Sequence, residues 1–319
     1  MSKLMRTVNI GNMKVPAIAV GCRRMNNLST EEADRYIKTS MDLGANFFDL
    51  ADLYGGSLSE KVFGEVMAAN PTIRDKMFIQ TKCGIRKAMN AFDLSKDYIL
   101  SSVDGCLERL HTDYIDVLLI HRMDALYEPE EIAEAFGILQ QNGKVRAFGV
   151  SNATPMQIEL LKRYVNQPLV INQMQFSLAH CTMVSQGIYT NMDNGGAVDR
   201  DGGILDYCRL NDITIQTWSP LQYGFQEGVF IGSPKFPELN KVLDALAAKY
   251  SVTPGAIAFA WILRHPAHMQ PITGTLKTAR LKECVDAVDI TLTRDEWYEL
   301  FTAAGNPLPC NPQPGQART

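Results

Sequence analysis

Several features that define whole classes of proteins are missing from this sequence. No apolar run reaches the ~18 residues that a membrane-spanning helix requires. No lysine- and arginine-rich run points to nucleic acid, and the net charge is only −4. Residues 1–7 lack the apolar core of a signal peptide. We therefore expect a cytoplasmic protein that binds neither a membrane nor nucleic acid.

Motifs for metal binding and for nucleophilic catalysis are missing as well. The seven cysteines include no Cys-x-x-Cys pair, and no His-x-His sequence occurs, so we predict no metal site. The absence of Gly-x-Ser-x-Gly argues against a serine hydrolase. No Gly-x-Gly-x-x-Gly follows the first strand, which argues against a Rossmann dinucleotide-binding fold. Seven scattered cysteines are typical of reduced thiols in a cytosolic protein.

Short apolar strands alternate with amphipathic helices along most of the chain. Ser29 with Glu32, and Thr154 with Pro155, are typical helix starts. The expected strands are 17–20, 46–48, 77–81, 115–120, 145–150, 169–172, 213–217 and 270–273. The expected helices are 29–43, 59–69, 95–110, 128–141, 154–164, 202–210, 236–250, 254–264 and 277–287.

This alternation without a linker predicts an α/β fold, a single (β/α)₈ barrel domain over residues 1–319. Residues 7–15 are expected to form a hairpin that turns at Gly11-Asn12. Residues 293–304 add one more helix, and 173–200 are expected to be a long irregular segment. Segments 1–6 and 305–319, the latter rich in proline, are expected to be flexible tails.

Polar residues able to ionise stand at the ends of three successive strands. Asp49 ends the second strand, with Tyr54 in the loop after it, while Lys82 and His121 end the third and fourth. Strand ends converge at one mouth of such a barrel. A nearby ammonium lowers the pKa of a phenol, and a carboxylate keeps a buried lysine charged. Taken alone, each residue also fits a structural role, but together they predict a general acid aimed at a carbonyl oxygen.

These residues lie within longer motifs. The motifs are Phe48-Asp49-Leu50-Ala51-Asp52-Leu53-Tyr54-Gly55, Thr81-Lys82-Cys83-Gly84, Leu118-Leu119-Ile120-His121-Arg122, Gly149-Val150-Ser151-Asn152 and Asn172-Gln173. With them the chain resembles the aldo-keto reductases from about residue 7 to residue 303, and among these the bacterial YdhF-like oxidoreductases. The resemblance implies a (β/α)₈ barrel with an N-terminal hairpin across its bottom. It also implies a catalytic tetrad of Asp49, Tyr54, Lys82 and His121, with Tyr54 as the acid.

The resemblance further implies a nicotinamide cofactor held without a glycine-rich motif. Arg280 lies at a helix start, where an arginine suits a phosphate, so NADPH (NADP+) is favoured and NADH is the lesser alternative. Gly274 stands where NADPH-preferring relatives often carry a lysine. The residues implied to hold the cofactor are Gly21, Cys22, Arg23, Asp49, Ser151, Asn152, Gln173, Trp218, Ser219, Leu221, Thr275, Arg280, Glu283 and Cys284.

Two functions remain open from the sequence. One is NADPH-dependent reduction of an aldehyde or ketone, a small-molecule carbonyl substrate, to the alcohol. The other is a cofactor-sensing regulatory or partner-binding subunit with little turnover, in which residues 173–200 and the proline-rich tail contact the partner. Met25, Met123 and Trp218 predict a largely apolar substrate pocket. We expect a monomer or a weak homo-oligomer, and a structural role for Asp52.

Overall fold

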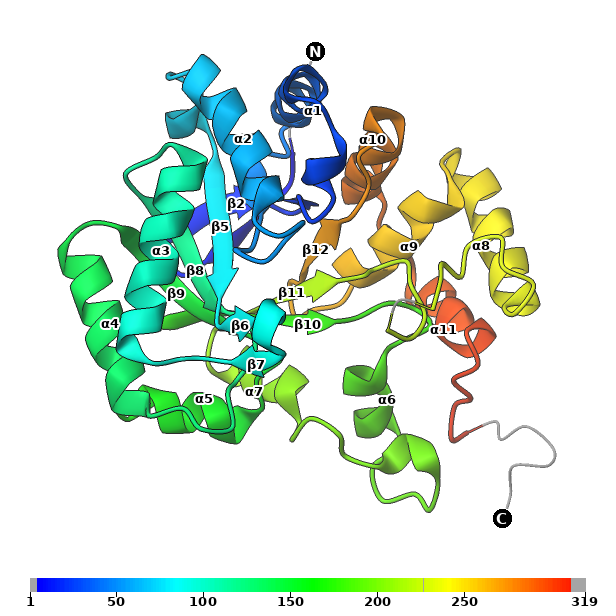
Figure 1. Cartoon of the computed structure of the whole chain (residues 1–319). Coiled ribbons are helices and arrows are strands. Elements are labelled where there is room, and N and C mark those ends of the chain that lie inside the picture. Colours follow the sequence, from blue (N-terminus) through cyan, green and yellow to red (C-terminus); the bar gives the residue numbers. More distant parts are fainter. Residues whose placement is uncertain (1–4, 226, 311–319) are drawn as a thin grey trace.

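Eight parallel strands form a closed barrel in the structure, a computed structural model that describes residues 5–225 and 227–310. Each strand pairs with the next, and the last pairs with the first. The predicted barrel is therefore confirmed (Figure 1). In chain order the strands are β3 (Ala19–Gly21), β4 (Phe47–Asp49), β5 (Phe78–Cys83), β8 (Ile115–Ile120), β9 (Val145–Ser151), β10 (Leu169–Gln175), β11 (Thr214–Trp218) and β12 (Gln270–Thr273).

Helices connect the strands and cover the outside of the barrel (Figure 1). The expected helix starts at Ser29 and Thr154 are both present, and each is a capping box in which the cap side chain accepts from the backbone N–H three residues later. The helices are α1 (Thr30–Asp42), α2 (Leu58–Ala69), α3 (Lys96–Leu110), α4 (Pro129–Gln141), α5 (Pro155–Lys162), α7 (Ile204–Leu210), α8 (Pro237–Tyr250), α9 (Pro254–Leu263), α10 (Thr278–Asp286) and the extra α11 (Arg294–Ala303). Short 3₁₀ turns lie at Met25–Asn27, Arg74–Lys76, Lys87–Met89, Gly195–Ala197 and Ala287–Asp289.

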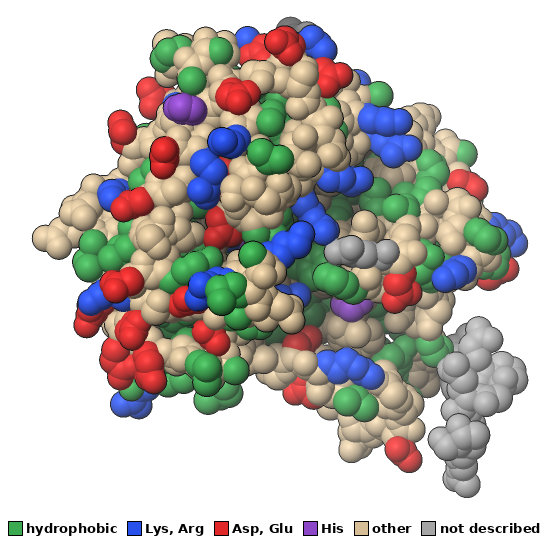
Figure 2. Space-filling view, in the orientation of Figure 1, with side chains coloured by type: hydrophobic (Ala, Val, Ile, Leu, Met, Phe, Trp, Pro, Cys, Tyr) green, Lys and Arg blue, Asp and Glu red, His purple; other side chains and the backbone are tan. Residues whose placement is uncertain are grey.

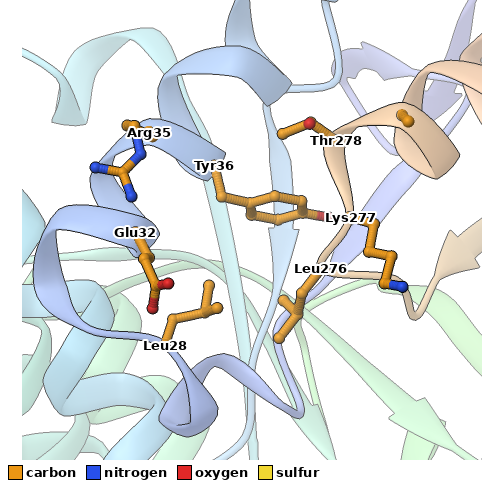
Figure 3. Close-up of a pocket in the computed structure, with 8 residues that line it drawn as sticks. Leu28, Glu32, Arg35, Tyr36, Leu276, Lys277 and Thr278 are labelled. Carbon is orange, nitrogen blue, oxygen red and sulfur yellow. The ribbon is translucent and has the colours of Figure 1, made fainter.

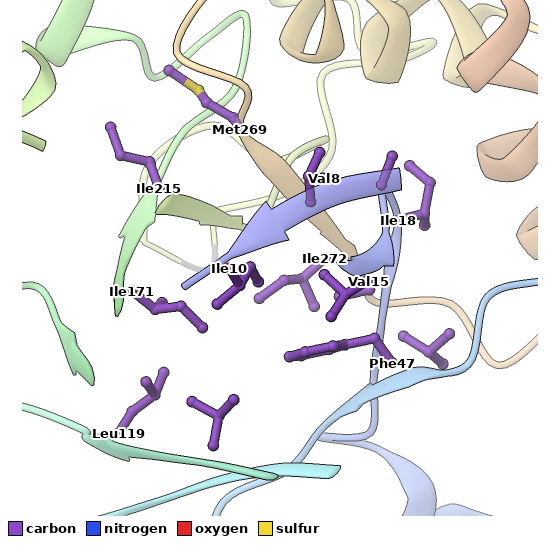
Figure 4. Packing of buried hydrophobic residues seen from close by; sticks show 14 of the residues in the cluster. Val8, Ile10, Val15, Ile18, Phe47, Leu119, Ile171, Ile215, Met269 and Ile272 are labelled. Atoms are coloured by element: carbon purple, nitrogen blue, oxygen red, sulfur yellow. The ribbon is translucent and has the colours of Figure 1, made fainter. Parts of the chain in front are cut away.

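The N-terminal hairpin closes the bottom of the barrel. Strands β1 (Thr7–Ile10) and β2 (Met13–Pro16) pair antiparallel, as predicted. Thr214 donates to the Asn9 carbonyl at 3.0 Å, and Gln270 donates to the Pro16 carbonyl at 2.6 Å. Both donors are the first residues of their strands, so the hairpin covers the N-terminal ends, with its apolar side chains in the core (Figure 4). The opposite, C-terminal mouth is left for ligands.

The expectation of a long irregular segment at 173–200 is wrong. Strand β10 continues to Gln175, and α6 (Thr182–Ile188) follows. The α6 sequence contains β-branched residues and a glycine, whose helix propensity is low, so the sequence gives little helical signal. Burial of Met183 and Val184 against the core stabilises the helix instead. A two-stranded hairpin, β6 (Ile85–Arg86) and β7 (Ala91–Phe92), was not predicted because each strand is only two residues long.

Much of the two predicted tails lies outside the described residues, namely 1–4 and 311–319. Within the described part, the Tyr189 hydroxyl donates to the Pro307 carbonyl at 2.7 Å, and Leu308 packs against the core. This portion of the tail therefore contacts the end of α6.

In the described ranges, no single helix is long and apolar enough to cross a membrane. Helices α8 and α9 meet the length and composition criteria only as a pair, bent by 91° at the break between them.

Candidate active site

Lys82 is the centre of the predicted tetrad. It lies fully buried near the end of β5. Its ammonium is 2.7 Å from Asp49 Oδ1, 2.7 Å from the Leu50 carbonyl oxygen and 3.2 Å from the Tyr54 hydroxyl. The structure thus brings together the carboxylate, the ammonium and the phenol that the strand ends predicted.

The Asp49 carboxylate is held by three donors. Besides Lys82, the side-chain amides of Gln80 and Gln173 donate to the same oxygen, Oδ1, at 2.5 Å and 3.0 Å. One of these three donors is an ammonium, which forms a charge-assisted hydrogen bond to the carboxylate. The ammonium and the carboxylate therefore form an ion pair that is almost completely shielded from solvent.

His121 completes the tetrad from the residue after β8. Its ring lies 5.9 Å from the Tyr54 ring, centre to centre, in an edge-to-face arrangement. Burial lowers the pKa of His121 well below its usual range, and the positive charges of Lys82, Arg122 and Arg23 lower it further. His121 is therefore neutral at neutral pH. Its Nδ1 atom is buried and has no hydrogen-bond partner in the described part of the chain.

The charge balance around Tyr54 differs from the sequence expectation. Burial raises the pKa of Tyr54, and the Lys82 ammonium offsets this only in part. For Lys82, burial alone lowers the pKa, but the charges and hydrogen bonds of Asp49 and Tyr54 outweigh it and leave the pKa raised. Lys82 thus acts on Tyr54 in the predicted direction, but desolvation has the larger effect.

Four predicted cofactor residues lie at the neighbouring strand ends. Ser151 donates to the Gln173 carbonyl at 2.9 Å and accepts from the Asn152 amide at 2.7 Å. The Trp218 indole N–H donates to Asn152 Oδ1 at 3.2 Å. These bonds link the ends of β9, β10 and β11 into one polar rim beside the tetrad.

The loop after β11 folds back toward that rim. Ser219 has a left-handed backbone with φ 54° and donates to Gln222 Oε1 at 3.1 Å. The carbonyl of Leu221, which is half-buried, accepts from the Phe230 N–H at 3.2 Å. The Phe225 ring stands edge-on to Trp218, with the ring centres 6.2 Å apart. These contacts place the loop beside the exposed part of the indole.

The residues predicted for the adenosine end lie apart from the tetrad, around the start of α10. Arg280 is exposed, Glu283 accepts from Thr253 at 3.3 Å, and Cys284 is buried against Thr273. Next to them is a hollow of about 360 Å³ between α1 and the segment after β12 (Figure 3). Tyr36 points across it and donates to the Thr275 carbonyl at 2.5 Å. The hollow is lined by Leu28, Glu32, Arg35, Tyr36, Leu276, Lys277, Thr278 and Ala279.

The segment after β3 joins these two regions. A Cβ at Gly21 would lie 2.7 Å from the Thr273 carbonyl oxygen, so only glycine allows β3 and β12 to approach this closely. The Cys22 thiol is buried and directed at the Val20 carbonyl, and burial raises its pKa well above the usual value. Its backbone, rather than its thiol, is therefore the part suited to a ligand.

Three glutamines of the barrel interior were missed by the sequence interpretation. Gln216 accepts on Oε1 from Gln80 and Gln173, at 2.8 Å and 3.0 Å, and donates to Gln270 at 2.8 Å. Gln270 then donates to the Pro16 carbonyl of the bottom hairpin. A continuous chain of amides thus runs from Asp49 to the bottom of the barrel. The signal in the sequence was a glutamine within, or at the start of, an expected strand.

No cluster of three or more histidine, cysteine, aspartate or glutamate side chains suited to a metal ion occurs among the residues that the structure describes.

The chain is similar to proteins of one family. The sequence model described as the aldo/keto reductase family matches residues 17–303. Oxidoreductase YdhF of Escherichia coli is 34% identical over 286 residues, which are 87% of this chain and 89% of that protein. The 6-dehydroglucose reductase of Novosphingobium aromaticivorans is 33% identical over 316 residues, which are 95% of this chain and 97% of that protein.

A solved structure agrees with these sequence matches. The thermostable aldo-keto reductase Tm1743, solved with the inhibitor epalrestat, matches with a TM-score of 0.76 and 25% identity. The match covers 94% of this chain and 100% of that one. The predicted resemblance to YdhF-like oxidoreductases is confirmed by the YdhF match. The chain therefore belongs to the aldo/keto reductase family and is an oxidoreductase that acts on carbonyl or alcohol groups.

Proposed function

We propose that this protein reduces an aldehyde or ketone to the alcohol with NADPH as the reductant and Tyr54 as the general acid. The observation that carries the proposal is the contact of 3.2 Å between the Lys82 ammonium and the Tyr54 hydroxyl, backed by the buried Asp49 carboxylate. An ammonium in this position stabilises the phenolate that remains after Tyr54 gives up its proton.

The residues at the mouth suit a nicotinamide dinucleotide. The hydroxyl and amides of Ser151, Asn152 and Gln173 match the donors and acceptors of a carboxamide. The half-exposed Trp218 indole offers a flat surface for a ring. When bound, NADPH supplies a hydride for the carbonyl carbon.

The chain's own residues supply the proton and the electrostatic stabilisation. The substrate carbonyl oxygen lies between the Tyr54 hydroxyl and the neutral His121 imidazole, which donates a hydrogen bond to it. As the carbon gains a hydride, the oxygen gains the Tyr54 proton, and an alcohol results. Lys82 stabilises the phenolate left behind, and Asp49 offsets the cost of burying Lys82.

The adenosine end supports NADPH over NADH. Arg280 is exposed in the first turn of α10, where backbone N–H groups are also free to bind. A guanidinium at a helix N-terminus suits the extra phosphate of NADPH. Glu283 and Thr275 lie within the same region and would contact the adenosine.

The substitution Tyr54→Phe tests the mechanism. We expect kcat for an aldehyde to fall about 10²- to 10⁴-fold, the range for loss of a general acid, while NADPH binding by fluorescence titration is retained. Tyr164→Phe is the matched control, because Tyr164 is exposed and far along the chain from the tetrad. Full turnover by Tyr54→Phe would contradict the proposed mechanism.

The same assay separates the proposal from the regulatory alternative. The name of the relative from N. aromaticivorans makes sugar-derived aldehydes a sensible part of the first substrate panel. Tight NADPH binding without oxidation by any member of a broad carbonyl panel would favour a cofactor-sensing subunit instead.

A further inference from the structure

Arg122 is a partly buried arginine without a partner. It follows His121 at the end of β8 and is half-buried. Arg74, Arg86, Arg109 and Arg264, the other described arginines that are not exposed, all bond to protein oxygen atoms. For Arg122, the described ranges 5–225 and 227–310 contain no hydrogen bond or ion pair. The guanidinium has lost part of its hydration without compensation from the protein.

The nearest acidic residue in the sequence does not pair with Arg122. Asp124 is half-buried, but its Oδ1 accepts from the Leu126 backbone N–H at 2.9 Å and so closes its own turn. Burial, with nothing to offset it, lowers the pKa of Arg122. The five N–H donors of the Arg122 guanidinium are therefore available to a ligand.

Arg23, which the family resemblance also implied as a cofactor residue, is a second cation without a partner among the described residues. It follows Gly21 and Cys22 at the end of β3, is exposed, and forms no ion pair or side-chain hydrogen bond within the described residues. Its charge lowers the pKa of both Tyr54 and His121, although burial is the largest influence on each. Arg122 also lowers the pKa of His121, so the two arginines act on that ring from two different strand ends.

The neighbouring Arg24, unlike Arg23, has a protein partner. Its guanidinium donates to the Gly274 carbonyl at 2.7 Å and so joins β3 to the segment after β12. On the face drawn in Figure 2, basic side chains form a band near the middle, bordered by hydrophobic ones. Unlike Arg24, Arg23 and Arg122 carry positive charge without a protein partner among the described residues.

We propose that Arg122 and Arg23 form an anion-binding subsite beside Tyr54 and His121, and that the substrate is a carbonyl compound carrying a carboxylate or phosphate group. The proposal rests on the proposed carbonyl reduction for its assay. Guanidinium groups bind both kinds of anion through paired, charge-assisted hydrogen bonds. An anion bound there would hold the substrate by its far end while the carbonyl oxygen meets Tyr54, which fixes the orientation for hydride transfer.

Two matched pairs of aldehydes test the subsite. Succinic semialdehyde is compared with butanal, and glyceraldehyde 3-phosphate with glyceraldehyde, by kcat/KM at low ionic strength. We expect the anionic member of at least one pair to be preferred about 10- to 100-fold, the range for a hydrogen bond to a charged group. The pair that shows the preference identifies carboxylate or phosphate as the bound group.

Substitutions then assign the preference to the two arginines. In Arg122→Met we expect the ratio of anionic to neutral kcat/KM to fall about 10-fold or more, and in Arg122→Lys to be partly restored. Arg23→Met should lower the same ratio. Arg163→Met is the matched control, because Arg163 is exposed after α5 and forms no side-chain bond in the described part of the chain. An equal ratio for both members of each pair in the wild type, or an unchanged ratio in Arg122→Met, would overturn the proposal.

A binding measurement separates this proposal from the proposed function. Succinate and inorganic phosphate are titrated into the protein with and without NADP+ by calorimetry, which needs no turnover. Binding that weakens about 10-fold or more in Arg122→Met supports the subsite even when no aldehyde is reduced. Turnover of neutral aldehydes without anion binding would leave carbonyl reduction standing and overturn the subsite alone.

Discussion

Gln270 donates from Nε2 to the Pro16 carbonyl oxygen at 2.6 Å, and this bond sets the direction of the amide chain that leads to Asp49. A backbone carbonyl only accepts, so Gln270 must turn its own oxygen toward Gln216. Gln216 then presents its oxygen to Gln80 and Gln173, and both of these turn their N–H groups toward Asp49. The orientation of Gln173, a predicted cofactor residue, is thus fixed from the bottom of the barrel.

Gln216→Met should weaken both stability and catalysis. The variant keeps the side-chain length but leaves N–H groups of Gln80 and Gln173 without an acceptor, at a cost of about 1–3 kcal/mol in the free energy of unfolding for each buried group. A misoriented Gln173 should lower kcat/KM about 10- to 100-fold. Urea unfolding and steady-state kinetics measure the two effects. Gln141→Met, at an exposed glutamine, is the control, and normal kinetics in Gln216→Met would show that the amide chain is only structural.

Removing one partner of the buried ion pair should lower the free energy of unfolding more than removing both partners. Lys82→Met leaves the Asp49 carboxylate buried without its cation, and we expect the free energy of unfolding to fall by about 3–5 kcal/mol. The double variant Asp49→Leu, Lys82→Met removes both charges and should be more stable than the sum of the single losses implies. Chemical denaturation of all four proteins gives the coupling energy, and strict additivity would contradict a direct pair. Both single variants should lose carbonyl reduction.

Asp52 should make stability depend on pH. Burial raises the pKa of Asp52 to about 6, its hydrogen bond from Ser102 opposes this, and Oδ1 has no partner among the described residues. A raised carboxyl pKa means that the folded state binds a proton more readily than the unfolded state. The resulting stability is fully present below about pH 4 and is lost as pH rises through about 6.

Asp52→Asn removes this titration. At pH 8 the variant should be about 1–3 kcal/mol more stable than the wild type in urea unfolding, and at pH 4 the difference should be small. Asp193→Asn, at an exposed aspartate, is the control for loss of one carboxylate. A constant difference between the Asp52 variant and the wild type from pH 4 to pH 8 would contradict a raised pKa.

Arg280→Met should change cofactor preference rather than chemistry. If Arg280 binds the extra phosphate, the Kd for NADPH should rise about 10- to 100-fold while the Kd for NADH changes little. Fluorescence titration of both cofactors is the direct measurement. Arg163→Met serves again as a control for loss of one surface charge. An equal weakening of NADPH and NADH would place Arg280 elsewhere on the cofactor.

The sequence was sufficient to predict the barrel and the convergence of the four tetrad side chains at one mouth. Strand–helix alternation is a local pattern, and Asp49, Lys82 and His121 each stand at a recognisable strand end. The amide chain was not predictable, because Gln80 and Gln216 meet across the barrel from positions 136 residues apart. The raised pKa of Tyr54 could not be predicted from the local sequence either, because it depends on how deeply the loop after β4 is buried.

The contact between Pro16 and Gln270 also bears on how the protein is made. These residues are 254 positions apart, so the bottom of the barrel closes only after synthesis has passed β12. Long-range closure of this kind is slow, because the entropy of the intervening chain opposes it. A nascent chain that ends before β12 already has Thr214 as a donor for Asn9, but it lacks the donor for Pro16. The orientation of Gln173 is therefore among the last features of the fold to be fixed.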